Sequence, residues 1–338
     1  MKYIFLILFF LSSCWVQKPE IVIDKPFNEI KKENSLEKDW DSKKQQRFLS
    51  SWLQTNTSIS SINIDLVISG WPSKDGIPAI NQPTFSPIQK SKEKMSYLRS
   101  KDFGISVAIW GEAKFYPYAV MVWHEIVNDI IDDTKIAVTF CPLCGSAIVY
   151  DRETLEWLYT FWVSGKLFQS NMLMYDSKTE SLWSQSLWEA VVWEKLWVKL
   201  DHIWSNLMTF SEFEAAYPNW KVLSDNTGYT RNYGLIPYGD YDTSDDLYFS
   251  VENSDTRFPK KEIFYVVPFQ NSSIVFHFLN LKEEWQASFN IWDKEITITF
   301  NDWIIEAKND QTILAGYYEM WFSWRTHNPK NENIWSKK

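Results

Sequence analysis

A chain of 338 residues is long enough for one large or two ordinary domains, and its 45% of hydrophobic residues is ample for a sizeable core. The formal net charge of -9 at pH 7 argues against a general nucleic-acid binder, which would carry a basic face. Nucleic acid is therefore not expected as a partner.

Tryptophan and glycine occur in an unusual ratio. The chain holds 20 Trp and 10 Gly, although average usage would give about 24 Gly at this length. Several Trp stand in polar or turn-forming segments where glycine is the usual residue: Trp188, Trp193, Trp197, Trp220 and Trp303. We hypothesise that many of these positions are UGA codons that the source organism decodes as glycine, as some bacterial lineages do. A genuinely Trp-rich surface, such as that of a carbohydrate-binding protein, is the alternative.

The first 14 residues have the pattern of a secretion signal. Lys2 is a short basic region, Tyr3–Leu11 is apolar but too short to span a bilayer, and Leu11-Ser12-Ser13-Cys14 resembles a bacterial lipobox. This pattern predicts lipidation at Cys14 and a lipoprotein anchored to a membrane of the cell envelope, facing outside the cytoplasm. A cleaved signal with an incidental Cys is the alternative.

The remaining chain divides by composition into three parts. Residues 15–60 are polar and suit a tether that carries one helix, residues 61–330 are expected to form a single β-rich domain, and 331–338 a short tail. Short strand-like runs predominate, and Ser273–Ala315 alternates polar and apolar residues. The expected fold class is mainly β (α+β), with antiparallel hairpins, a meander and a few short helices.

The segment before the cysteine pair predicts a hairpin and a helix. Ile105–Ile109 and Ala113–Tyr116 read as paired strands, and Pro117 could open a helix over Tyr118–Ile130. His124 and Asn128 would then share one helix face.

Cys141-Pro142-Leu143-Cys144-Gly145 is expected on the turn between two strands, Ile136–Phe140 and Ala147–Tyr150. No helix is indicated after Cys144, whereas redox pairs of the thioredoxin type place the first Cys at a helix start. Pro and Gly at these places resemble a metal knuckle of zinc ribbons, but no second Cys pair follows. Metal ligation, a thiol/disulfide couple and a purely structural turn therefore all remain open.

Other residue types extend this candidate site. Cys141, Cys144 and His124 are candidate ligands for Zn or Cu, and Met172 and Met174 share a strand face that could add soft ligands for copper or simply fill the core. Glu125 and Asp176 are the candidate catalytic carboxylates. Arg231 could bind an anion, although pairing of a buried Arg with Asp240 or Asp242 is the commoner explanation. The further polar candidates are Asn128, Asp129, Asn171, Gln185, Arg231 and His327.

Several longer motifs together resemble one family, that of domain of unknown function 3179. They are DGIPAI (Asp75–Ile80), GEAKFYP (Gly111–Pro117), WHEIVND (Trp123–Asp129), CPLCGSA (Cys141–Ala147), SGKLFQSNMLMYD (Ser164–Asp176), SLWSQ (Ser181–Gln185), TGYTRNYG (Thr227–Gly234) and the MWFSW ending with its later His and Pro. The resemblance covers roughly 62–329. It implies a β-rich domain with signature polar residues His124, Glu125, Asn128, Asp129, Cys141, Cys144, Asn171 and Asp176, but it carries no established activity. Trp71, Trp157 and Trp188 stand where the family pattern has glycine.

The leading expectation is a metal-binding envelope lipoprotein that uses the Cys141/Cys144 turn and His124. A thiol/disulfide redox or electron-transfer accessory protein and a non-catalytic lipoprotein with a structural disulfide are the alternatives. The sequence leaves a protein or small-molecule partner unidentified.

Overall fold

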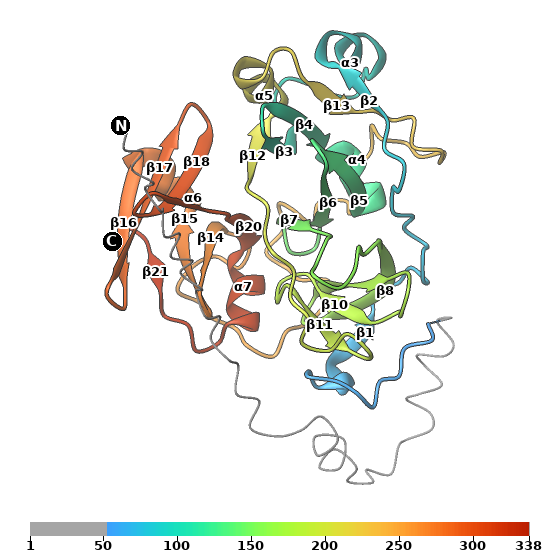
Figure 1. Cartoon of the computed structure of the whole chain (residues 1–338), viewed down its shortest axis with the longest axis vertical. Coiled ribbons are helices and arrows are strands. Elements are labelled where there is room, and N and C mark those ends of the chain that lie inside the picture. Colours follow the sequence, from blue (N-terminus) through green and yellow to red (C-terminus); the bar gives the residue numbers. More distant parts are fainter. Residues whose placement is uncertain (1–52, 338) are drawn as a thin grey trace, which may run out of the picture. The chain divides into compact units, whose positions relative to one another are not determined.

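The computed structural model describes residues 53–337, and within them it is mainly β, as the sequence predicted (Figure 1). The predicted signal peptide, Cys14 and the helix of the tether lie outside the described residues. Among the described helices, none is long and apolar enough to cross a membrane.

The cysteine pair lies on a strand turn, as expected, within a run of six consecutive elements. These are β3 (Phe103–Ile109), β4 (Glu112–Pro117), α4 (Tyr118–His124), β5 (Ile126–Ile131), β6 (Thr134–Cys141) and β7 (Ser146–Asp151). The pairs β3/β4, β5/β6 and β6/β7 are antiparallel, and Cys141 is opposite Ser146.

The predicted helix over Tyr118–Ile130 is half as long as expected. It ends at His124, because Glu125 has a φ of 58° and breaks the helical path. The β-branched run that follows then pairs as strand β5. His124 and Asn128 therefore do not share a helix face.

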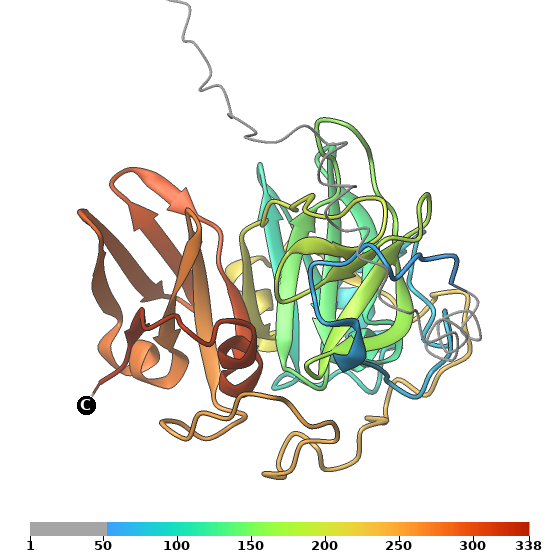
Figure 2. The ribbon, with the colours of Figure 1, turned by 90° about the horizontal axis from the view of Figure 1, so that it is seen from below.

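The same order of elements recurs later in the chain (Figure 2, orange to red). The second set is β14 (Ile263–Phe269), β15 (Ser272–His277), α6 (Phe278–Glu284), β16 (Gln286–Ile291), β17 (Lys294–Asn301) and β18 (Ile304–Asn309). The hydrogen bonds correspond as well: Phe140 N donates to Glu125 O over 2.8 Å, and Phe300 N donates to Trp285 O over 2.8 Å.

Each set is completed by a strand, a helix and a further strand. The first is completed by β12 (Ser205–Thr209), α5 (Phe210–Ala216) and β13 (Lys221–Leu223), and the second by β20 (Tyr317–Met320), α7 (Trp321–His327) and β21 (Ile334–Trp335). Strands β12 and β20 run antiparallel to β3 and β14, whereas β13 and β21 run parallel to β4 and β15. We therefore describe the domain as two structural repeats, which we call the first and second repeat.

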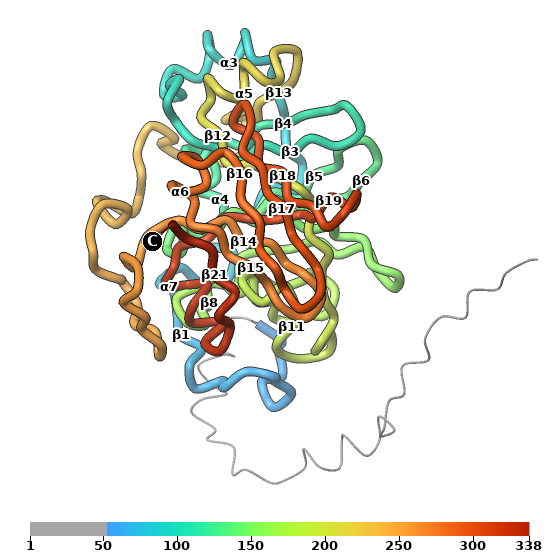
Figure 3. The backbone as a smooth tube through the Cα atoms, turned by 90° about the vertical axis from the view of Figure 1, so that its left-hand side faces the viewer, coloured from blue at the N-terminus to red at the C-terminus, as the bar shows by residue number. Residues whose placement is uncertain are grey.

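A seven-stranded sheet joins the repeats in the order β21-β15-β14-β20-β7-β6-β5, because β20 pairs with both β14 and β7. The sheet β12-β3-β4-β13-β2 belongs to the first repeat, and β16-β17-β18-β19 to the second. Figure 3 shows the backbone from the side of the second repeat, which is coloured orange to red. The smaller elements here are β2 (Phe85–Pro87), α3 (Ile88–Lys94) and β19 (Thr312–Leu314).

An inserted sheet interrupts the first repeat after β7. It has the order β1-β8-β9-β10-β11 and consists of β1 (Val67–Ser69), β8 (Phe161–Phe168), β9 (Asn171–Asp176), β10 (Leu182–Ser184) and β11 (Glu189–Val192), with the short helix η1 (Ile64–Leu66) just before β1. One hydrophobic core lies between this sheet and the repeats, and both Cys141 and Cys144 belong to it.

The backbone supports the glycine hypothesis at eight of the Trp positions. Each has a positive φ, a conformation that glycine adopts far more readily than Trp: Trp71, Trp110, Trp188, Trp193, Trp197, Trp285, Trp292 and Trp303. By contrast, Trp183, Trp321 and Trp324 are fully buried and do not have a positive φ. Trp157 and Trp220, which were also suspected, do not have one either.

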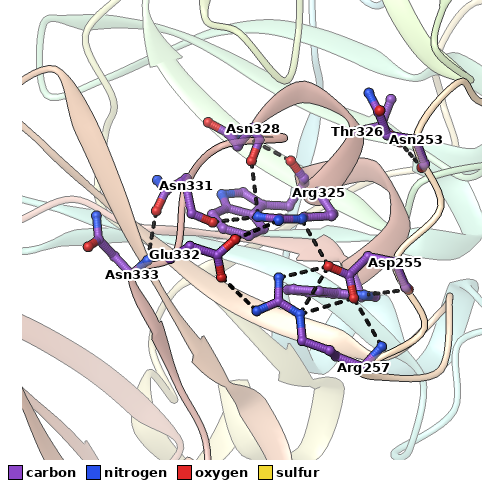
Figure 4. A network of polar contacts seen from close by, with 11 residues as sticks. Asn253, Asp255, Arg257, Arg325, Thr326, Asn328, Asn331, Glu332 and Asn333 are labelled. Atoms are coloured by element: carbon purple, nitrogen blue, oxygen red, sulfur yellow. Dashed lines mark hydrogen bonds and ion pairs between the residues drawn. The ribbon is translucent and has the colours of Figure 1, made fainter.

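Helix α7 is fixed by a polar network at its last turn (Figure 4). Arg325 contacts Asp255 Oδ2 at 3.0 Å and Glu332 Oε1 at 2.7 Å. Arg257 links the same two carboxylates, each at 2.7 Å. The network ties α7 to the segments before β14 and before β21, and so fixes the helix that passes beside the cysteine turn.

Candidate functional site

The two cysteines are free thiols that touch one another inside the protein. Cys141 is 2% exposed and Cys144 is fully buried. The Cys144 thiol lies within hydrogen-bonding reach of the Cys141 thiol and also donates to Ser170 O over 3.1 Å. Met320 N donates to Cys144 O over 2.9 Å, so strand β20 of the second repeat holds the turn in place.

A buried carboxyl group lies on the Cys144 side of the turn. Ser323, on α7, is within hydrogen-bonding reach of the Cys144 thiol and donates to Glu319 Oε1 over 2.6 Å. Ser186 donates to the same oxygen over 2.7 Å, while Oε2 has no partner among the described residues. Burial raises the pKa of Glu319 to about 7, although both serine hydrogen bonds lower it. Burial, followed by contact with Cys141, raises the pKa of Cys144, and Ser323 lowers it.

Amide side chains form a second layer behind this carboxyl group. Asn171 donates to Gln185 Oε1 over 3.0 Å, and Ser146 donates to the same oxygen over 2.6 Å. Gln185 in turn donates to Thr139 Oγ1 over 2.9 Å, and Ser186 N donates to Asn171 Oδ1 over 3.1 Å. The network therefore connects β9 and β10 of the inserted sheet to the β6–β7 hairpin. Asn171 and Gln185, both predicted as site candidates, are brought beside the turn.

Cys141 faces a different, small pocket. Its volume is about 30 Å³, enough for one or two water molecules, and its walls include Cys141, Glu125, Tyr238 and Met172. The Tyr238 hydroxyl donates to Glu125 Oε1 over 3.1 Å. Burial raises the pKa of Glu125 to about 7, against the lowering effect of that hydrogen bond. Glu125 and Cys141 are therefore walls of one pocket, whereas Glu319 is linked to Cys144 through Ser323.

His124 lies outside both parts of this site. Its Nδ1–H donates to Pro78 O over 2.7 Å, and its Nε2 accepts from the Tyr233 hydroxyl over 2.8 Å. Burial lowers the pKa of His124 to about 4, so the ring is neutral at pH 7. Within residues 53–337, no group of three or more His, Cys, Asp or Glu is arranged to hold a metal ion.

Three of the predicted polar residues have their hydrogen-bonding groups occupied by structural contacts. Asn128 bonds Asn81 and both backbone groups of Phe161. Asp129 accepts from Lys114 over 2.9 Å and Tyr116 over 2.6 Å. Asp176, a candidate catalytic carboxylate, accepts from the backbone of its own turn, from the Thr179 hydroxyl and from Trp183 Nε1. Through these hydrogen bonds, the three polar residues hold strands and turns together.

The remaining candidates lie in separate surroundings. Arg231 forms no ion pair among the described residues, contrary to the expected pairing with Asp240 or Asp242, and lies 5.9 Å from the Trp123 ring centre. His327 Nδ1–H donates to Ser323 O over 2.8 Å. Burial lowers the pKa of His327 to about 4, against the raising effect of the backbone of Ser323 and Phe168. Met174 is buried in the core but is not a wall residue of the Cys141 pocket.

Sequence reasoning missed Glu319, Ser323 and Tyr238. Glu319 did carry a usable signal, because it is the one charged residue in the apolar run Tyr317–Trp324. Its contact with the cysteine turn joins positions far apart in the sequence, and no local pattern predicts that contact.

A protein-family model matches most of this chain. The model of the family described as "Protein of unknown function (DUF3179)" matches residues 74–316. The chain belongs to the DUF3179 family. The match includes Glu125 and the cysteine turn, and it stops at Gly316, just before β20, which carries Glu319. No curated protein and no solved structure matches the chain.

Proposed function

We propose that Cys141 and Cys144 form a dithiol/disulfide couple and that the protein is a thiol redox protein. The observation that supports this best is the pair of buried carboxyl groups, Glu125 beside Cys141 and Glu319 beside Cys144, each with a pKa raised to about 7. Oxidation of two thiols to a disulfide releases two electrons and two protons, and groups with a pKa near ambient pH are effective proton acceptors.

The proposed reaction reduces a low-molecular-weight disulfide, since burial of both thiols keeps out bulky substrates. The Cys141 thiol passes its proton to Glu125, and its thiolate attacks one sulfur of the substrate, whose S–S bond breaks and whose other sulfur leaves as a thiolate. The Cys144 thiol passes its proton through Ser323 to Glu319. Its thiolate then attacks the Cys141 sulfur, forms the internal disulfide and expels the second substrate thiolate. The two leaving thiolates take up the two protons.

Redox titration tests this proposal. Purified protein is equilibrated in glutathione buffers of graded potential, and its free thiols are counted after acid quenching. A reversible transition of two thiols is expected, and Cys144→Ser should trap a mixed disulfide of glutathione with Cys141. If the thiols stay reduced at every potential, they form no redox couple. If oxidation is irreversible and only raises stability, the pair is a structural disulfide. Either result refutes the proposal.

Metal binding is the second candidate, because Met172 and Cys141 are walls of one pocket. Two thiolates and a thioether are soft ligands suited to Cu(I), whereas Zn(II) would need a further His, carboxylate or water. His124 is not proposed as a ligand, since both its ring nitrogens are hydrogen-bonded elsewhere. Metal content by mass spectrometry, with Met172→Leu and Cys141→Ser variants, tests this: loss of Cu(I) in both variants supports the site.

We further propose that the protein is a lipoprotein of the cell envelope, anchored through Cys14. The lipobox-like sequence at Leu11–Cys14 supports this. Metabolic labelling with a fatty acid tests it, because Cys14→Ala should lose the label and leave the membrane fraction. Labelling that persists in Cys14→Ala contradicts the anchor.

A further inference from the structure

A large cleft lies where the two repeats face each other. Its volume is about 630 Å³, within the range of small-molecule sites. Corresponding positions of the two repeats line it: Tyr118 and Ala119 in the first turn of α4 match Phe278 and Leu279 in the first turn of α6. The cleft is therefore a product of the duplication, with one wall from each repeat.

The lining favours ring compounds over extended chains. Aromatic side chains come from both repeats and from the segment between them: Tyr97, Phe103, Tyr118, Phe140, Tyr233, Tyr238, Tyr241 and Phe278. The rings of Tyr118 and Phe140 stack, with their centroids 4.0 Å apart. Flat rings gain stacking energy on such walls beyond that of simple apolar burial.

The charges at the cleft indicate an uncharged occupant. The three basic lining residues, Arg99, Lys101 and Lys261, are balanced by the three acidic ones, Asp102, Asp242 and Glu262. Three of the six also contact other groups of the protein. Glu262 contacts His277 at 3.3 Å, Asp102 accepts from Arg99 N over 2.8 Å, and Lys261 donates to the carbonyl oxygen of Ser244 over 2.6 Å. A charged ligand would gain no net attraction and would lose its hydration.

The second repeat does not have the residues that form the candidate site in the first repeat. The positions that correspond to His124, Glu125 and Cys141 hold Glu284, Trp285 and Asn301, and a short turn at Asp302-Trp303 replaces the cysteine turn. The second repeat therefore supplies a wall of the cleft, while the first supplies both a wall and the thiols.

We propose that this cleft binds an uncharged, low-molecular-weight compound with a flat ring system, held between the repeats against the outer side of the cysteine turn. Pro142 and Gly145 of that turn line the cleft, and Tyr238 lines both the cleft and the Cys141 pocket. The proposal does not depend on the redox function, because neither cysteine is a lining residue of the cleft.

The test uses N-phenyl-1-naphthylamine, a neutral ring compound whose fluorescence increases in apolar surroundings. Saturable binding is expected, and 1-indanone should displace the probe while 1-decanol should not. Ala119→Trp and Leu279→Trp fill the cleft from opposite repeats, and each should weaken binding by about tenfold or more. Ile313→Trp, at an exposed site on β19 that does not line the cleft, is the matched control and should bind as the wild type does.

Three outcomes overturn the proposal: no saturable binding, equal binding by both cleft-filling variants and wild type, or displacement by 1-decanol in preference to the ring compound. The last would assign the cleft to acyl chains instead. Binding to Cys141→Ser should be unchanged, so failure of the redox proposal and failure of the cleft proposal give different results.

Discussion

The hydroxyl of Ser323 lies between a thiol and a carboxyl group: it donates to Glu319 Oε1 over 2.6 Å and is within hydrogen-bonding reach of the Cys144 thiol. A hydroxyl has one proton to donate. It can therefore donate to a Cys144 thiolate only if Glu319 is protonated and donates to it in turn. The charge states of Cys144 and Glu319 are thereby linked through one side chain.

Removing this hydroxyl should raise the pKa of Cys144. We expect Ser323→Ala, in a Cys141→Ser background, to raise it by about one unit, the equivalent of one hydrogen bond. Thiolate ultraviolet absorbance as a function of pH measures the shift. Ser186→Ala is the matched control, since Ser186 bonds the same Glu319 oxygen, whereas Ser323 is the serine that reaches the Cys144 thiol. Equal shifts in both variants would contradict a specific link.

Glu319 should make folding pH-dependent in a defined direction. Its folded pKa of about 7 lies above the ordinary value of 4.5, so its stabilising contribution is fully present below pH 4.5 and is lost as pH rises through 7. Relative to Glu319→Gln, the wild type should lose about 3 kcal/mol of unfolding free energy across that window. Urea unfolding of both proteins from pH 4.5 to 8 measures this. Buried histidines titrate in the opposite sense but cancel in the difference, so a flat difference curve refutes the raised pKa.

Glycine at the strained Trp positions should stabilise the fold. Trp110 has a φ of 47° and Trp285 a φ of 63°, and both side chains are exposed. Each substitution by Gly should raise the unfolding free energy by about 1 kcal/mol through relief of left-handed strain. Trp183→Gly is the contrasting control and should cost about 3 kcal/mol or more, because that indole is buried and bonds Asp176 over 3.1 Å. Urea unfolding decides, and a UGG codon at position 110 or 285 would independently contradict recoding there.

We expect the polar network at the end of α7 to affect both the stability of the fold and the pKa of Cys144. Arg325→Ala removes the arginine that pairs with both Asp255 and Glu332. It should lower the unfolding free energy by about 2 kcal/mol, since the Arg325 side chain is only 11% exposed. The more exposed Arg257→Ala should cost about 1 kcal/mol or less. Thermal unfolding gives both values. If α7 is fixed by Arg325, that variant alone should also change the pKa of Cys144.

The sequence predicted local features well. The cysteine turn, the β3/β4 hairpin and the start of α4 at Tyr118 follow from strand composition, Gly111 and Pro117. The predicted end of α4 was wrong because Glu125 adopts a positive φ, which glycine ordinarily supplies at a helix end. No helix propensity predicts that a glutamate will adopt it.

The duplication was not predicted because the repeats retain their shape while sharing few residues. Matching identities such as Ile136 with Ile296 and Phe140 with Phe300 are ordinary core residues. For a related reason, the sequence predicted only the part of the candidate site that lies in the first repeat. Glu319 and Ser323 reach Cys144 through the pairing of β20 with β7, a contact between distant segments.

The place of β20 in the central sheet also determines when the site is complete during synthesis. A growing chain carries both thiols long before it carries Glu319, and the Ala147 end of β7 gains its partner Tyr318 only when β20 has been made. The carboxyl group, the serine that links it to Cys144 and the strand that closes the sheet are then added within one short stretch, Tyr317–Ser323. The Cys144 thiol of a partly synthesised chain therefore lacks the neighbouring carboxyl group of Glu319, and β20 and α7 complete its surroundings late in synthesis.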